Sequence, residues 1–266
     1  MAKNPNGCPI TISLYVSNTA TNYNVARYYY EKGNDIGVHS VTHKLIKTRS
    51  TLLQEANDQL MNLVIRAGIP RDKITGWRSP YLETAGDIQI DVLQQLGLQY
   101  DISLIKPFMS KVNDSHGSHY EPPDFYWPFT LDHTGWPFIC YIPPCPKRSH
   151  KGFWEVPLNE LADITKTGAC SMTDDCPNSP KNENEVFHYL WYNFEINYKR
   201  NRAPFGIHLH PTWFKSEFNL NGLDKFIQES LKLENVYIVS VQKMLEWIRN
   251  PVSVDKITQF KPWLCN

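Results

Sequence analysis

The feature that most restricts the fold of this chain is the alternation of strand and helix patterns through residues 10–102. Residues 10–16 carry the alternating, β-branched pattern of a strand, and residues 51–67 carry apolar side chains at helical spacing. Strands that alternate with helices at this spacing predict βαβ units around a parallel sheet or barrel. The expected strands are 10–16, 35–38, 74–77 and 99–102, and the expected helices are 22–32, 51–67 and 88–96.

Residues 106–180 differ from the rest of the chain because they are rich in proline, cysteine, glycine and aromatic side chains. We interpret them as a loop-rich insertion with short strands at 127–131, 138–142 and 153–156. The remainder predicts helices at 183–198, 223–233 and 241–249 and strands at 205–209 and 236–240. We therefore expect one α/β domain over residues 1–266.

Charge and hydropathy exclude two classes of partner. The 27 basic residues balance the 27 acidic residues, so net charge gives no reason to expect nucleic acid or an anionic membrane. No apolar run approaches the roughly 18 residues that span a bilayer. We expect a monomer. Aromatic residues make up 13% of the chain, a share that suits sugar stacking and ordinary packing equally well.

The six cysteines indicate an oxidising compartment. None lies in a C-x-x-C pair, which argues against a zinc knuckle, and an even number in loop-rich segments favours three disulfides. We expect a secreted protein in which Cys8 pairs with Cys265 and Cys140, Cys145, Cys170 and Cys176 staple the insertion. Residues 1–5 have no apolar signal core, so we expect a chain shortened at its start. The alternative is a cytosolic protein with six thiols.

Two histidines follow the strand expected at 35–38. His39 and His43 are four residues apart at the predicted opening of the next helix, where both imidazoles would share one face and reach one divalent cation. Two imidazoles need at least one further ligand. The alternative is an ordinary pair of surface or core histidines.

Further candidate residues follow other predicted strands. Arg78 is suited to orient a carboxylate, the Tyr81 backbone N–H to stabilise an oxyanion, and His210 to act as a general acid. Trp213 and Trp154 are candidate walls for a sugar ring. The alternative for Arg78 is a structural ion pair, and that for Pro80 and Tyr81 is a simple turn. The alternative for Trp213 is ordinary packing at the mouth of the barrel. Glu155 is expected to be a solvated charge.

Four short motifs in order resemble the polysaccharide deacetylase family, carbohydrate esterase family 4. They are His39-Ser40-Val41-Thr42-His43, Arg78-Ser79-Pro80-Tyr81, Gln99-Tyr100-Asp101 and Leu209-His210. The segments around Cys8, around Cys145 and at 201–206 are similar to those of animal chitin deacetylases. The resemblance implies a distorted (β/α) barrel. It also implies a zinc or cobalt-type ion held by two histidines and an aspartate, and removal of acetyl groups from N-acetylglucosamine in chitin or a related polysaccharide.

Carried over residue by residue, the resemblance makes His39 and His43 metal ligands and His210 the acid that protonates the leaving amine. Arg78 would order the catalytic base, and the Tyr81 backbone N–H would line the oxyanion pocket. Pro80, Trp154 and Trp213 are the expected substrate-binding residues.

The chain departs from the family at the first motif. Thr-Phe-Asp-Asp on the opening strand supplies the base and the third metal ligand, and the three residues before Asn4 do not contain it. Asp174-Asp175 lies in the insertion, while Asp35 and Asp101 are expected to be structural strand residues. We therefore expect a missing first strand, an unpaired sheet edge and impaired catalysis. The alternatives are a catalytically inactive secreted chitin-binding or matrix-organising protein and a cytosolic relic without a ligand.

Overall fold

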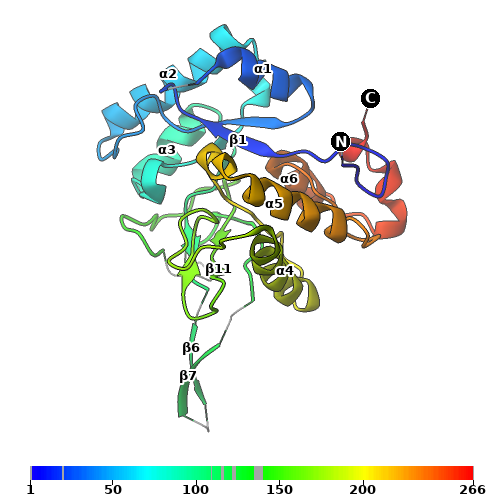
Figure 1. Ribbon diagram of the computed structural model, residues 1–266. Coiled ribbons are helices and arrows are strands. Elements are labelled where there is room, and N and C mark those ends of the chain that lie inside the picture. The colour runs from blue at the N-terminus through cyan, green and yellow to red at the C-terminus, as the bar shows by residue number, and fades with distance from the viewer. Residues whose placement is uncertain are drawn as a thin grey trace. The chain divides into compact units, whose positions relative to one another are not determined.

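The computed structural model describes residues 2–19, 21–108, 110–114, 117–121, 124–134 and 140–265. The chain divides into two compact units (Figure 1). Unit 1 comprises Met1–Leu104, Pro128–Val156 and Asn235–Asn266, and unit 2 comprises Ile105–Trp127 and Pro157–Glu234.

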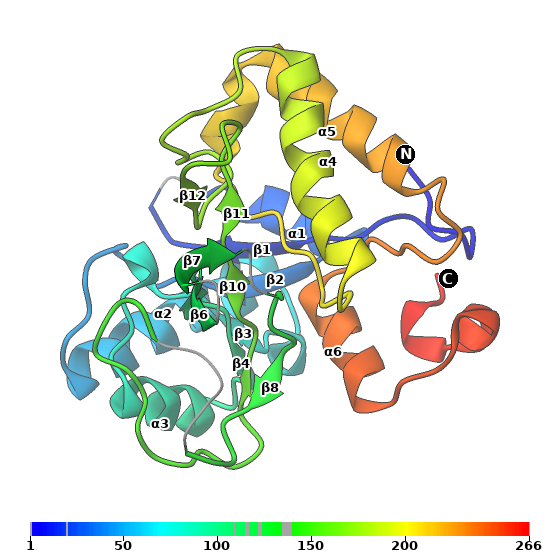
Figure 2. The ribbon, with the colours of Figure 1, turned by 90° about the horizontal axis from the view of Figure 1, so that it is seen from below.

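Unit 1 is built on a six-stranded sheet in the order β1-β2-β3-β4-β9-β8 (Figure 2). The first five strands in this order run parallel, and β8 runs antiparallel to β9. The predicted parallel sheet is confirmed. The strands are β1 (Ser13–Val16), β2 (Asp35–Val38), β3 (Gly76–Trp77), β4 (Tyr100–Asp101), β8 (Phe129–Thr130) and β9 (Trp154–Glu155).

Helices cover both faces of this sheet. α2 (Arg49–Ala67) buries Leu52 and Leu60 in the larger core together with Val16 of β1, as its apolar spacing predicts. Tyr15 and Tyr100 belong to a second cluster with Leu245, a residue of α6 (Val241–Arg249). Successive strand side chains point to opposite faces, so β1 serves both cores. The other helices of unit 1 are α1 (Tyr23–Glu31) and α3 (Asp87–Gln95).

β1 lies at one end of the strand order, in agreement with the expected edge. The segment 236–240 runs beside the residues that lead into β1, where the Thr11 N–H donates to the Ile238 carbonyl at 3.3 Å. The Asn4 side chain also bonds both the N–H and the carbonyl of Ile238. The prediction of a strand at 236–240 is wrong, because these residues form no strand and the Asn4 and Thr11 side chains bind the backbone of Ile238 and Ser240.

Unit 2 combines short strand pairs with two packed helices. α4 (Glu183–Lys199) contacts α5 (Glu217–Ser230), and Gly222 permits their close approach because a Cβ there would lie 2.5 Å from that of Val186. The strand pairs are β5 (Ile105–Lys106) with β10 (Leu158–Asn159), β6 (Ser110–Asp114) with β7 (Gly117–Glu121), and β11 (Leu161–Ala162) with β12 (Ala169–Cys170).

Two other predicted strands are not found. Residues 205–209 do not pair as a strand. The His208 carbonyl instead accepts a hydrogen bond from the Thr173 N–H at 2.6 Å. Of the strand expected at 138–142, residues 138 and 139 lie outside the described residues and 140–142 are not a strand.

The predicted number of three disulfides and the predicted pairing of Cys8 with Cys265 are confirmed. The other pairs, which the sequence analysis left open, are Cys140–Cys145 and Cys170–Cys176. Within the described parts of the chain, no helix has the length and apolar character needed to cross a membrane.

Candidate functional site

His39 and His43 lie in a loop, so the prediction that they open a helix is wrong. Ser40 and His43 adopt left-handed backbone angles, with φ of 63° and 53°. The loop's N–H groups are bound by side chains, because Ser40 Oγ accepts the His43 N–H and Glu55 of α2 accepts that of Val41. Side-chain acceptors of this kind compete with helix formation, and α2 starts only at Arg49.

The two imidazoles nevertheless converge. His39 Nε2 lies 3.1 Å from His43 Nε2, and His39 Nδ1 lies 2.8 Å from the Arg78 carbonyl. In the neutral ring, Nδ1–H donates to that carbonyl, so the ring's lone pair is on Nε2, the nitrogen that faces His43. Two nitrogens on one tetrahedral zinc ion at about 2.0–2.1 Å are about 3.3 Å apart. The spacing of the pair therefore fits two ligands of one divalent ion.

A third ligand of the usual type does not join this pair. No group of three or more His, Cys, Asp or Glu side chains suited to a metal occurs among the described residues. The end of β1 borders the pair, since the His39 N–H donates to the Val16 carbonyl at 3.1 Å and Ser17 Oγ donates to the His39 carbonyl at 2.6 Å. Tyr15, Val16 and Ser17 bring no carboxylate to this place.

The Arg78 segment follows β3 and lies next to the histidines. Arg78 is buried, and its backbone N–H donates to the Val38 carbonyl at 3.0 Å. Its positive charge is among the influences that lower the pKa of Asp101 and Tyr15, although burial outweighs it at both. Pro80 is buried, whereas Tyr81 is 62% exposed and packs its ring 4.8 Å from that of His43.

A buried pair of carboxyl groups lies at the ends of β4 and β9. Asp101 and Glu155 are neighbours in the parallel register, and both are almost fully buried. The expectation that Glu155 is solvated is therefore wrong. Gln89 and Ser103 donate to the Asp101 carboxyl group, and the Leu104 N–H donates to Glu155 Oε1 at 3.2 Å. Glu155 Oε2 has no hydrogen-bond partner within the described residues.

This environment favours the protonated acids. Burial raises the pKa of Asp101 to about 7. Burial, and secondarily the charge of Asp101, raise the pKa of Glu155 well above its ordinary value. Asp35 in β2 has a structural role, because its carboxylate accepts hydrogen bonds from the Ser13 hydroxyl and from a backbone N–H at the N-terminus of α6.

In unit 2, His210 contacts an aspartate that lies far from it in sequence. Asp174 Oδ2 lies 2.9 Å from His210 Nδ1 and accepts the His210 backbone N–H at 3.0 Å. His210 precedes a short 3-10 helix, η3 (Pro211–Lys215), in which the Trp213 and Phe214 rings lie 5.7 Å apart. Trp213 is half-buried.

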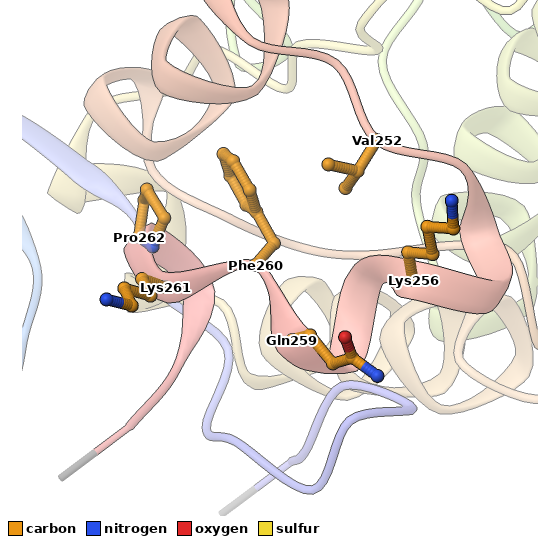
Figure 3. A pocket seen from close by; sticks show the side chains of 6 residues that line it. All are labelled: Val252, Lys256, Gln259, Phe260, Lys261 and Pro262. Carbon is orange, nitrogen blue, oxygen red and sulfur yellow. The ribbon is translucent and has the colours of Figure 1, made fainter.

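A shallow hollow of unit 1 lies elsewhere, in the C-terminal segment (Figure 3). It has a volume of about 400 Å³ and contains none of the predicted site residues. Its lining residues are Val252, Lys256, Gln259, Phe260, Lys261 and Pro262. This hollow is therefore separate from the candidate chemistry.

Comparison with known proteins agrees with the sequence motifs. The family model described as polysaccharide deacetylase matches residues 4–100. Chitin deacetylase 8 of Bombyx mori is 31% identical over 265 residues, with coverage of 96% of this chain and 66% of that protein. Chitin deacetylase 1 of Bombyx mori is 30% identical over 278 residues, and the match covers 98% of this chain and 48% of that protein. The chain thus spans about two thirds and about half of the length of these curated relatives.

A solved structure supports the same fold. A Mycobacterium smegmatis protein assigned to the polysaccharide deacetylases superposes with a TM-score of 0.64 at 15% identity, and the match covers 90% of this chain and 72% of that one. The chain belongs to the polysaccharide deacetylase family, and its α/β fold of that type is confirmed. Among the described strands the sheet does not close into a ring.

Sequence reasoning missed two features of the candidate sites. The first is the Asp174–His210 contact, for which the only signal was an aspartate inside a short cysteine-bounded segment. The second is the burial of Glu155, which follows from the unforeseen pairing of β9 with β4. The roles predicted for Pro80, Tyr81, Trp154 and Trp213 stay predictions.

The raised carboxyl pKa values predict a pH dependence of folding. The Asp101 carboxyl group, whose pKa is raised by folding, binds its proton more tightly in the folded state, so its effect on stability becomes less favourable as pH rises from 3.8 to about 7. Asp101→Asn should flatten this decline in the free energy of unfolding, measured by urea denaturation across that range. Asp72→Asn is the control, because the Asp72 side chain is 75% exposed. An unchanged slope in Asp101→Asn would contradict the raised pKa of the buried acid.

Proposed function

We propose that this chain binds chitin or a related N-acetylglucosamine polysaccharide and holds zinc or a similar divalent ion weakly between His39 and His43. Its deacetylase turnover is impaired. The observation that best supports the proposed metal site is the 3.1 Å distance between His39 Nε2 and His43 Nε2, with His39 Nδ1 bonded to the Arg78 carbonyl. We further propose that residues 1–266 form one catalytic domain of a secreted, monomeric protein, which the three disulfides support.

The proposed roles divide the chemistry of amide hydrolysis among the chain's own residues. A bound divalent ion would supply Lewis-acid polarisation and a more acidic water. His39 and His43 would hold that ion, and the Tyr81 backbone N–H would donate to the developing oxyanion. His210 would deliver a proton from Nε2 to the leaving amine, since Nδ1 is engaged by Asp174.

The impairment is inferred from the residues around the histidine pair. Thr-Phe-Asp-Asp is expected before Asn4, so β1 is not the strand that carries it. The end of β1 borders the pair, where the His39 N–H donates to the Val16 carbonyl, and Tyr15, Val16 and Ser17 offer no carboxylate there. Tyr15 is no substitute base, because burial raises the pKa of its phenol and its hydroxyl is bonded to that of Tyr100 at 3.0 Å. A two-imidazole site without an anionic ligand should bind metal weakly.

The second candidate function is a catalytically inactive secreted protein that binds chitin or organises a matrix. The surroundings of the histidine pair favour it, because the described residues bring no third His, Cys, Asp or Glu ligand to the pair. Under this alternative, sugar binding through aromatic side chains persists while acetate release is absent.

Acetate release tests the proposed impairment. The unmodified chain with added zinc should release little or no acetate from N-acetylglucosamine oligomers. The chain extended at its N-terminus by a segment that carries Thr-Phe-Asp-Asp should raise the rate by about 100-fold, the usual contribution of a positioned base. The same extension with Thr-Phe-Asn-Asn is the control of matched shape without charge. Turnover by the unmodified chain equal to that of the extended chain would refute the impairment.

Sedimentation with insoluble chitin tests the binding proposal. Trp213→Ala should weaken binding roughly 3- to 10-fold, in line with the loss of one aromatic stacking contact. Trp127→Ala, which removes another indole of unit 2 that is 38% exposed, is the control and should bind like the unmodified chain. Equal binding by both variants would contradict the role of Trp213.

A further inference from the structure

Two tyrosines of unit 1 are more exposed than any other Phe, Tyr or Trp side chain among the described residues. Tyr81 is 62% exposed and Tyr141 is 64% exposed. The Tyr141 side chain makes no hydrogen bond or ring contact with the residues that the structure describes. A single exposed ring is ordinary on a protein surface, so its meaning depends on how the ring is held and on what lies near it.

Tyr141 lies in a small loop that is fixed at both of its described ends. The Cys140–Cys145 disulfide closes the loop. The Thr84 hydroxyl, which belongs to the residues just before α3, donates to the Pro144 carbonyl. The loop is therefore tied to itself by a covalent bond and to the neighbouring segment of unit 1 by a hydrogen bond.

The residues after the loop are clamped by two acidic side chains of α3. Asp87 Oδ1 accepts the backbone N–H groups of Lys147 and Arg148, each at 2.9 Å. The same oxygen lies 2.8 Å from His150 Nε2, and the Arg148 guanidinium donates to Asp91 Oδ2 at 2.8 Å. The His150 side chain is only 2% exposed, so part of this clamp is shielded from water. These contacts hold the loop in one place on α3.

The clamped loop continues the surface of the candidate site. The Tyr81 ring packs 4.8 Å from that of His43, which places Tyr81 at the histidine pair. Thr84 follows Tyr81 by three residues, and Pro144 follows Tyr141 by three residues. Each of these stretches spans at most about 11 Å. One extended oligosaccharide can therefore contact both exposed rings.

We propose that Tyr141 is a sugar-contact residue, whose ring stacks on a pyranose of an N-acetylglucosamine oligomer that also lies against Tyr81. This inference rests on the proposed function and adds a contact away from the histidine pair. The apolar face of a pyranose suits the face of a tyrosine ring. Because the Cys140–Cys145 loop is already fixed, little conformational freedom is lost when the sugar binds. The added contact favours long oligomers over short ones.

The test is calorimetric titration with the soluble hexamer and dimer of N-acetylglucosamine. Tyr141→Ala should weaken hexamer binding roughly 3- to 10-fold, the loss of one aromatic stacking contact, and should weaken dimer binding less. Tyr141→Phe keeps the ring and should bind like the unmodified chain. Tyr28→Ala is the second control, because it removes a 54% exposed tyrosine of α1 and should leave both affinities unchanged.

The role of the loop is tested in a chain without its disulfide. In the Cys140→Ala/Cys145→Ala background, Tyr141→Ala should cost less hexamer affinity than in the unmodified chain, because the ring is no longer held in place. An equal cost in both backgrounds would overturn the role of the disulfide.

Two outcomes separate this inference from the proposed function. Equal hexamer affinity in the unmodified chain and Tyr141→Ala would overturn the inference while the proposed function stands, as would equal losses for hexamer and dimer. An unmodified chain that binds neither oligomer would overturn the proposed function and this inference with it.

Discussion

The candidate metal site depends on the hydrogen bond between His39 Nδ1 and the Arg78 carbonyl. It joins the residues that follow β2 and β3, whose register is fixed by the pairing of Val38 with Trp77. The bond selects the tautomer of His39 and turns its Nε2 atom toward His43. A left-handed turn at Ser40 and the capture of loop N–H groups by Glu55 then bring the second imidazole to the same point. Sheet register and loop chemistry together create the pair.

The distribution of negative charge around this pair explains the expected loss of activity. The nearest end of β1 carries no carboxylate, and burial raises the pKa of Tyr15 and keeps its phenol neutral, although the bond to Tyr100 acts in the opposite direction. Asp101 and Glu155 are carboxyl groups of the same unit, but burial raises the pKa of both and favours their protonated forms. This chain has the family's fold and two convergent imidazoles, while the strand beside them, β1, offers an apolar and a phenolic side chain.

Local patterns were sufficient to predict much of this structure. The alternation of strands and helices and the apolar face of α2 follow from periodicity. The number of cysteines predicted three disulfides, of which only the Cys8–Cys265 pair was predicted by its residues. The predictions failed where distant side chains decide the local conformation. Glu55 keeps residues 41 and 42 out of a helix, and Asn4 binds the backbone of Ile238 in a segment predicted as a strand. The pairing of Asp174 with His210 and the burial of Glu155 likewise depend on contacts between segments remote in sequence.

The most direct test of the account is a calorimetric titration of zinc into the unmodified chain and into His43→Ala, with His133→Ala as a control that removes an exposed histidine of the same unit. The convergence of two imidazoles predicts one weakly bound zinc ion per chain. It also predicts a loss of affinity of at least about tenfold in His43→Ala and none in His133→Ala. Equal zinc affinity in the unmodified chain and His43→Ala would contradict the central claim that His39 and His43 share one cation.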